Sequence, residues 1–214
     1  MIKREESYHI IFAIIVLTFA VLYNPIINGN FNYGLLFLSL IFISILVLGN
    51  ILTKKIAAYY FESEISVKNW MWERYGYKQH NYFKTPIPLG IILSFVIAIL
   101  SRGLFIWMAI LESDAQGTSA RASKRHGIYR FTELTESNLS FILASGVIFN
   151  LLLSIIAYLA NLPQLGRWSI FYATYSLVPF GALDGTKIFF GSRVLWFALV
   201  VITLIFLSYA LFLP

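Results

Sequence analysis

An isolated acidic residue inside an apolar stretch is the first feature of this sequence that could do chemistry. Asp184 lies in the segment Leu177–Gly185, and no other acidic residue stands between Glu136 and the C-terminus. A charge at membrane depth costs about 2.5–3.5 kcal/mol on insertion scales and indicates a functional site. A proline and two glycines interrupt the helix here, and interrupted backbone at that depth must be satisfied by protein or water. We therefore expect Asp184 in a protein-lined pocket. The alternative is a cytoplasmic turn, since Lys187 and Arg193 follow.

The composition is that of an integral membrane protein. The chain is 59% hydrophobic and 12% charged, whereas soluble domains carry about 25% charged residues. It has no cysteine, which excludes disulfides, thiolate catalysis and thiolate metal sites. The formal net charge is +6, but in a membrane protein excess Lys and Arg mark the cytoplasmic loops. The lipid bilayer, and no nucleic acid, is therefore the expected partner.

The apolar segments predict a single membrane domain over residues 1–214. A transmembrane helix needs about 20 apolar residues. On this basis we expect an all-α integral membrane protein with about five full transmembrane helices plus a re-entrant hairpin. The predicted spans are 9–23, 33–61, 138–160, 168–190 with its broken Leu-Asp-Gly loop, and 194–213, and the hairpin is 86–111.

The hairpin follows from the position of one arginine. Ser101, Arg102 and Gly103 interrupt the apolar segment 86–111. One crossing would bury Arg102, and two full spans do not fit. A hairpin with these residues at its tip keeps both flanking basic loops on one side, as the positive-inside rule favours. Fourteen of the 16 Lys and Arg residues then lie inside, with Arg167 outside and Arg102 in the membrane. From this distribution we expect a cytoplasmic N-terminus, and we expect the protein to lie in the cell membrane.

The second predicted helix carries a small, polar face near its end. The residues of this face recur at spacings of three and four, so they share one side of the helix: Gly49, Asn50, Thr53, Lys54 and Ala57. Small and polar residues let membrane helices approach closely, so this face should pack against protein rather than lipid. Beyond it, the alternating residues of 62–85 indicate a short strand or hairpin at the interface.

Three pieces of the sequence together resemble a known family. They are the long second helix with its polar face, the segment Ala144–Asn150, and Leu177-Val178-Pro179 followed by Leu183-Asp184-Gly185. In this order they resemble the site-2 proteases, intramembrane zinc metalloproteases, as a divergent archaeal-type member, over roughly residues 33 to 200. The resemblance implies that family's membrane core, with zinc held by two histidines of a His-Glu-x-x-His helix and the aspartate of Leu-Asp-Gly. Asp184 matches the third ligand, and Asn150 matches a polar residue lining the site.

The zinc-binding helix departs from the family pattern. At the best alignment it reads Asn50-Ile51-Leu52-Thr53-Lys54, with neither histidine nor glutamate. The three histidines of the chain, His9, His80 and His126, include no pair four residues apart, although catalytic zinc usually takes three protein ligands. We therefore expect no catalytic residue, no metal and no cofactor, and the sequence disfavours an enzyme. The vestigial site positions are Asn50, Ile51, Lys54, Asn150 and Asp184.

A lysine stands where the resemblance expects the second zinc-binding histidine. If the family's packing is retained, Lys54 and Asp184 are neighbours. We hypothesise that they form an ion pair in which the ammonium replaces the zinc charge, completed by Asn50 and Asn150. The alternative is that Lys54 extends along the helix to the cytoplasmic headgroups.

Three functions remain open at the level of the sequence. The first is a catalytically inactive relative of the site-2 proteases that binds or scaffolds a transmembrane segment or a partner protein. The second is an active metalloprotease with unusual ligands, the only case in which zinc is expected. The third is a small transporter or a structural subunit of a membrane complex, because interrupted helices around a polar centre also occur in transporters.

Overall fold

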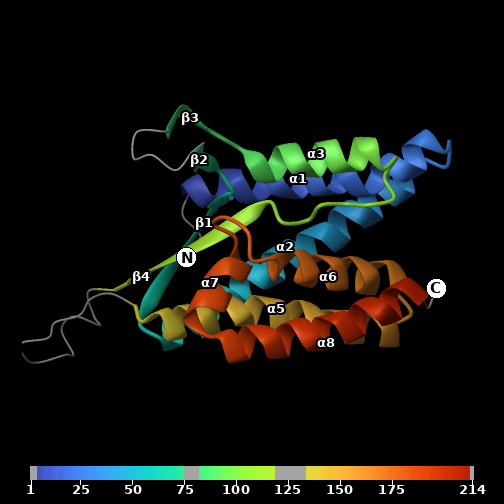
Figure 1. Ribbon diagram of the computed structural model, residues 1–214. Coiled ribbons are helices and arrows are strands. Elements are labelled where there is room, and N and C mark those ends of the chain that lie inside the picture. Colours follow the sequence, from blue (N-terminus) through green and yellow to red (C-terminus); the bar gives the residue numbers. More distant parts are fainter. Residues whose placement is uncertain (1–3, 75–81, 119–133, 213–214) are drawn as a thin grey trace, which may run out of the picture.

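The computed structural model describes residues 4–74, 82–118 and 134–212 and is mostly helical (Figure 1). Its helices are α1 (Arg4–Ile27), α2 (Tyr33–Tyr60), α3 (Leu89–Leu100), α5 (Glu136–Leu159), α6 (Pro163–Ser176), α7 (Asp184–Gly191) and α8 (Arg193–Phe212). Four short strands accompany them: β1 (Ser63–Asn69), β2 (Trp72–Arg74), β3 (Tyr82–Ile87) and β4 (Leu111–Gly117). The expectation of an all-α chain is therefore corrected to a helical chain with two small sheets.

Four helices are long and apolar enough to cross a membrane within the described ranges: α1, α2, α5 and α8. The fifth predicted span, 168–190, is instead divided into α6 and α7 by a loop. Pro179 lies in this loop, and Gly181 adopts a φ of +61° there, a value that L side chains rarely adopt. The described part of this membrane protein thus has four helices long and apolar enough to span a bilayer and one broken helical segment.

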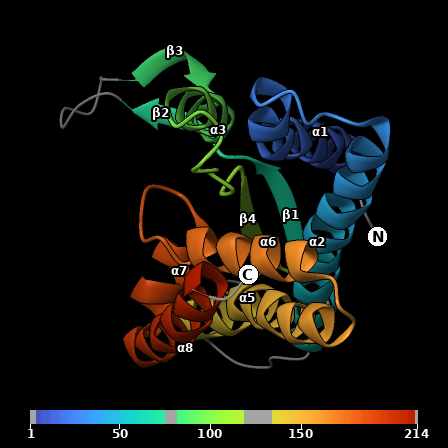
Figure 2. The same cartoon turned by 90° about the vertical axis from the view of Figure 1, so that its right-hand side faces the viewer.

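The helices form two groups on either side of the long ribbon β1–β4. Figure 2 shows α1 and α3 on one side of this ribbon and α5, α6 and α8 on the other. Helix α2 contacts both groups, because it packs against α1 and against α5. The end of α2 therefore lies where the two groups and the ribbon meet.

The segment 86–111 turns back on itself at Ser101–Gly103. Helix α3 forms the outgoing arm, and residues 104–110, here called the return arm, run back in extended form to β4 (Figure 1). At the tip, Asn24 Nδ2 donates a hydrogen bond of 3.1 Å to the carbonyl of Arg102. A Cβ at Gly103 would lie 2.6 Å from the backbone nitrogen of Asn24. Arg102 therefore lies at the tip of this turn, beside the α1–α2 turn and at one end of the bundle.

One of the two strand pairs joins segments that are far apart in the sequence. β1 pairs antiparallel with β4, with Val67 opposite Ser113, and β2 pairs antiparallel with β3. The region 62–85 does contain strands, but the partner of β1 comes from beyond the hairpin. Strand register of this kind depends on the hairpin bringing the two segments together.

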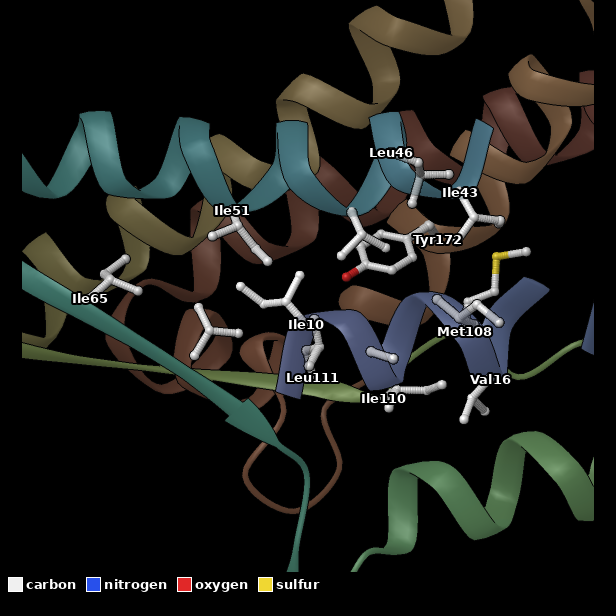
Figure 3. Close-up of a cluster of buried hydrophobic side chains, with 14 of the residues drawn as sticks. Ile10, Val16, Ile43, Leu46, Ile51, Ile65, Met108, Ile110, Leu111 and Tyr172 are labelled. Atoms are coloured by element: carbon white, nitrogen blue, oxygen red, sulfur yellow. The ribbon is translucent and has the colours of Figure 1, made fainter. Parts of the chain in front are cut away.

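The return arm is part of the main apolar core. Figure 3 shows Met108 and Ile110 among side chains from α1, α2, β1 and α6. Met108, Ile43 and Leu46 are each 0% exposed. Close packing on all sides fixes the arm, and through it the position of β4.

Candidate functional site

Lys54 and Asp184 form an ion pair in the protein interior. Lys54 lies near the end of α2, and Asp184 is the first residue of α7. Lys54 Nζ contacts Asp184 Oδ2, and the two side chains are only 4% and 5% exposed. Lys54 therefore does not extend toward headgroups, which was the alternative at the level of the sequence. Asp184 lies in a protein-lined site and not in an open turn.

Strand β4 supplies the third component of this site. Lys54 Nζ donates a hydrogen bond of 3.2 Å to Ser113 Oγ, and the Ser113 N–H donates one of 3.2 Å to Asp184 Oδ1. Lys187 Nζ donates a bond of 2.6 Å to the Ser113 carbonyl. Sequence reasoning missed Ser113 and Lys187. The only available signal was the triplet Glu112-Ser113-Asp114 directly after an apolar run.

These hydrogen bonds are made along the edge of β4 that does not pair with β1. Both backbone groups of Ser113 bind side chains of α7. In an antiparallel ladder such a residue belongs to a non-hydrogen-bonded pair, here with Val67. A free strand edge is a template for a further strand, and charged side chains are one way to cover it. Asp184 and Lys187 therefore take the hydrogen-bonding positions that an added strand would use at this residue.

Glycines on the facing helices allow α2 and α5 to approach closely at the site. A Cβ at Gly146 would lie 2.5 Å from Lys54 Cε and 2.7 Å from Asn50 Nδ2. Gly49 of α2 is similarly tight against the Phe149 ring. The polar face of α2 and the segment Ala144–Asn150 therefore pack against each other, as small residues at membrane helix contacts favour.

Asn50 and Asn150 do not join the ion pair. Both residues are 0% exposed, and their amide nitrogens and oxygens have no hydrogen-bond partner within the described part of the chain. Ser113 takes the place that the hypothesis gave to them, because β4 reaches the ion pair directly. Ile51 points into the apolar core with Ile10 (Figure 3). An unpaired buried amide is unfavourable by about 1–3 kcal/mol, so these two side chains are polar groups without an assigned role.

A second set of charges lies beside the site on the β1–β4 ribbon. Lys68 Nζ and Glu112 Oε1 are 3.0 Å apart, and the glutamate side chain is 4% exposed. Burial raises the pKa of the Glu112 carboxyl, and the Lys68 hydrogen bond opposes that shift only in part. The same hydrogen bond raises the pKa of Lys68. Both pKa values are raised, but for different reasons: the half-exposed lysine keeps its hydration and responds mainly to the hydrogen bond, whereas desolvation dominates at the buried Glu112 carboxyl.

The residues around Asp184 do not fit a zinc ion. Its carboxylate binds the Lys54 ammonium, which has no lone pair to offer a metal, and the Ser113 backbone. Within the residues that the structure describes, no group of three or more His, Cys, Asp or Glu side chains could hold a metal ion. His9 lies on α1, and His80 and His126 lie outside the described residues. Lys54 and Asp184 therefore meet in a lysine-centred site and not as part of a metal-ligand set.

Comparisons with known proteins leave the chain without an assigned relative. No protein-family model, no curated protein and no solved structure matches it. The resemblance to the site-2 proteases therefore rests on the residues quoted for it, and what it implies about function is a proposal.

Proposed function

We propose that this chain is a catalytically inactive membrane protein of the site-2-protease type that binds or scaffolds a transmembrane segment or a partner protein. One observation carries the proposal. The Lys54 ammonium contacts the Asp184 carboxylate at the two positions that the resemblance assigns to zinc ligands. A buried carboxylate needs a counter-charge, and in this chain a side chain supplies it in place of a metal.

The chemistry around the ion pair supports binding more than catalysis. Ser113 Oγ lies 3.2 Å from Lys54 Nζ, a pairing that some hydrolases use for nucleophilic attack. Such a nucleophile requires an adjacent base that can take its proton. An ammonium held by a carboxylate has no free lone pair for that purpose. Lys54 therefore orders α2, β4 and α7 around it rather than activating the serine.

Helix α8 supports the partner-binding part of the proposal. Only 17% of the most apolar 18-residue stretch of α8 is buried inside the molecule, whereas the buried share is 39–50% in the other three candidate spans. It packs on α5, α6 and α7, and Val201 and Leu204 on its outer face are 56% and 54% exposed. A helix with so much exposed apolar surface can pack against a second transmembrane helix as well as against lipid.

Restoring the two histidines tests whether the site has the inferred geometry. In the double variant Asn50→His/Lys54→His, two imidazoles one helical turn apart would face Asp184, which completes a three-ligand set. We expect about one zinc per chain in the purified variant, measured by elemental analysis, and loss of this zinc when Asp184→Ala is added. The control is Leu52→His/Ile56→His, which has the same spacing on an exposed face of α2.

The outcomes separate the alternatives. A folded double variant that binds no more zinc than the control would contradict a site-2-type arrangement. Stoichiometric zinc in the unchanged protein, lost on Asp184→Ala, would instead support an active metalloprotease with unusual ligands.

A crosslinking experiment addresses the partner. A photoreactive amino acid at Val201 or Leu204 should yield a discrete crosslinked membrane protein in native membranes, whereas the same probe at Ile56 of α2 should not. Crosslinks to lipid alone from all three positions would contradict a partner on α8. A fixed set of subunits that copurifies without crosslinking would favour a structural subunit of a membrane complex.

The proposed orientation places the N-terminus in the cytoplasm of a cell-membrane protein. Arg102 lies by the α1–α2 turn, while Lys55 and Lys68 lie at and beyond the opposite end of α2, so the basic residues gather toward one end, as on a cytoplasmic face. The chain has no cysteine, so single cysteines report topology without background. An impermeant thiol reagent should label Asn30→Cys in intact cells and Lys84→Cys only after lysis. The reverse pattern would overturn the orientation.

A further inference from the structure

The loop 177–183, between α6 and α7, is held to the β-ribbon side of the molecule by one aromatic side chain. The Phe180 ring stacks on Trp72, with centroids 5.7 Å apart, and meets Trp70 edge-on, also at 5.7 Å. The backbone follows closely, because a Cβ at Gly181 would lie 3.0 Å from the Trp70 ring. Phe180 nevertheless remains 45% exposed, so this attachment is only partly buried.

The loop leads directly into the site. Leu183 is 1% exposed and packs in one cluster with Trp70 and Ala109 of the return arm. The next residue, Asp184, binds the Ser113 N–H on β4. The end of the loop and the first turn of α7 therefore follow the return arm and β4, and together they cover the strand edge from Ala109 to Ser113.

The two ends of the loop are fixed close to each other. Trp196 Nε1 on α8 donates a hydrogen bond of 3.0 Å to the Leu177 carbonyl. A Cβ at Gly185 would lie 2.5 Å from that same carbonyl oxygen. A loop whose ends meet in this way is a compact unit. It can move away from Trp70 and Trp72 while α6, α7 and α8 remain packed.

We propose that the loop 177–183 is an aromatic latch that closes over the Lys54–Asp184–Ser113 site and opens locally, with Phe180 as the releasable contact. Opening uncovers the edge of the return arm that leads to β4 and controls access to the site. Only the purpose of that access, engagement of a partner segment, rests on the proposed function. The opening of the loop itself involves only contacts within this chain and does not depend on whether a partner binds.

A single reporter cysteine tests the latch, because the chain contains no other thiol. Ser113→Cys is a near-isosteric change at a position that is 1% exposed, and its reaction rate with a small methanethiosulfonate reagent in detergent measures access to the site. We expect slow labelling in the otherwise unchanged protein. Adding Phe180→Ala should increase the rate roughly tenfold or more, because two aromatic contacts are lost. Phe180→Leu should give an intermediate rate.

Two controls make the result decisive. Phe190→Ala removes an exposed phenylalanine of α7 whose ring contacts Phe189 and not the tryptophans, and it should leave the rate unchanged. Ser154→Cys, at a 0% exposed position in α5, should remain unreactive together with Phe180→Ala. Equal labelling of Ser113→Cys with and without Phe180 would overturn the latch, as would simultaneous labelling of Ser154→Cys, which indicates general loosening. Neither zinc nor a partner enters this measurement, so its failure is distinguishable from failure of the proposed function.

Discussion

Two adjacent lysines at the end of α2 form ion pairs in different regions of the molecule. Lys54 pairs with Asp184, and the two side chains are 4% and 5% exposed. Lys55 pairs with Glu6 at 2.6 Å, with exposures of 15% and 5%. Successive residues of a helix point about 100° apart, so Lys54 faces β4 and α7 while Lys55 faces the first turn of α1.

The difference lies in what each charge can do if its partner is removed. Lys55 is partly exposed and has a long flexible stem, so its ammonium can turn toward water. Lys54 is enclosed by Gly146 of α5, by Ser113 and by α7, and its charge would remain buried and unpaired. The comparison teaches that the cost of breaking an ion pair is determined by the packing around the remaining partner, more than by the pair itself.

The largest expected effect comes from breaking the Lys54 pair on one side only. Asp184→Ala should destabilise the protein by about 3–5 kcal/mol, because it leaves a buried ammonium without a counter-charge. The double variant Lys54→Leu/Asp184→Leu should lose far less, since two apolar side chains replace both charges. Thermal unfolding in detergent measures both variants. Similar losses in the two would show that the ion pair does not define this site.

A smaller effect should follow from crowding Lys54 without touching either charge. Gly146→Ala puts a methyl group 2.5 Å from Lys54 Cε and should destabilise the protein by about 1–3 kcal/mol, as overpacking does. As a control, Gly34→Ala in the first turn of α2 meets nothing closer than 3.9 Å and should be neutral or slightly stabilising. An unfolding midpoint unchanged by Gly146→Ala would mean that α5 can shift away from α2, and the enclosure of Lys54 would then be looser than inferred.

The Lys55 pair should be less sensitive. Glu6→Ala should cost about 1 kcal/mol, within the range of partly exposed ion pairs, because Lys55 can recover its hydration. The same unfolding measurement applies, with Glu5→Ala, an exposed acidic residue of the same helical turn, as the control. A loss as large as that of Asp184→Ala would remove the distinction between the two lysines.

The smallest expected effect is a pH dependence at the neighbouring Glu112. Burial raises the folded-state pKa of Glu112 above its ordinary value of 4.5, so the folded state holds this proton more tightly than the unfolded chain. The resulting contribution to stability is fully present below pH 4.5 and is lost as the pH rises through the folded-state pKa. Between pH 4 and pH 8 the unfolding temperature of Glu112→Gln should therefore fall less than that of the unchanged protein. A steeper fall would show that Lys68 outweighs burial.

Much of the site could be predicted because its members differ from their sequence surroundings. Asp184 is acidic in an apolar stretch, and Lys54 lies on a small polar face whose spacing identifies a helix contact. Gly146, within the quoted segment Ala144–Asn150, meets that face. Charges and glycines in apolar helices are costly unless packing uses them, so their positions carry information about contacts.

Other parts could not be predicted, because they depend on where an extended segment ends up. Nothing local to Leu111–Gly117 distinguishes a strand beside the site from a loop, and the expected all-α fold had no place for it. The resemblance predicts Asn50 and Asn150 beside the ion pair, because it aligns them with positions of the family's site. Ser113 reaches the pair instead, and it does so only because the hairpin returns through the core.

The sequence by itself determined that this is a mostly helical membrane protein with an acidic residue, Asp184, in an apolar stretch and a lysine, Lys54, on a small polar helix face, because burial of apolar surface and the cost of buried charge act on each segment separately. The tertiary structure alone decided which partners those groups have. Ser113, Lys187 and the Phe180 contact are set by strand pairing and by a return arm that packs between distant helices. These contacts join residues that lie far apart in the sequence, so no periodic pattern of residues indicates them.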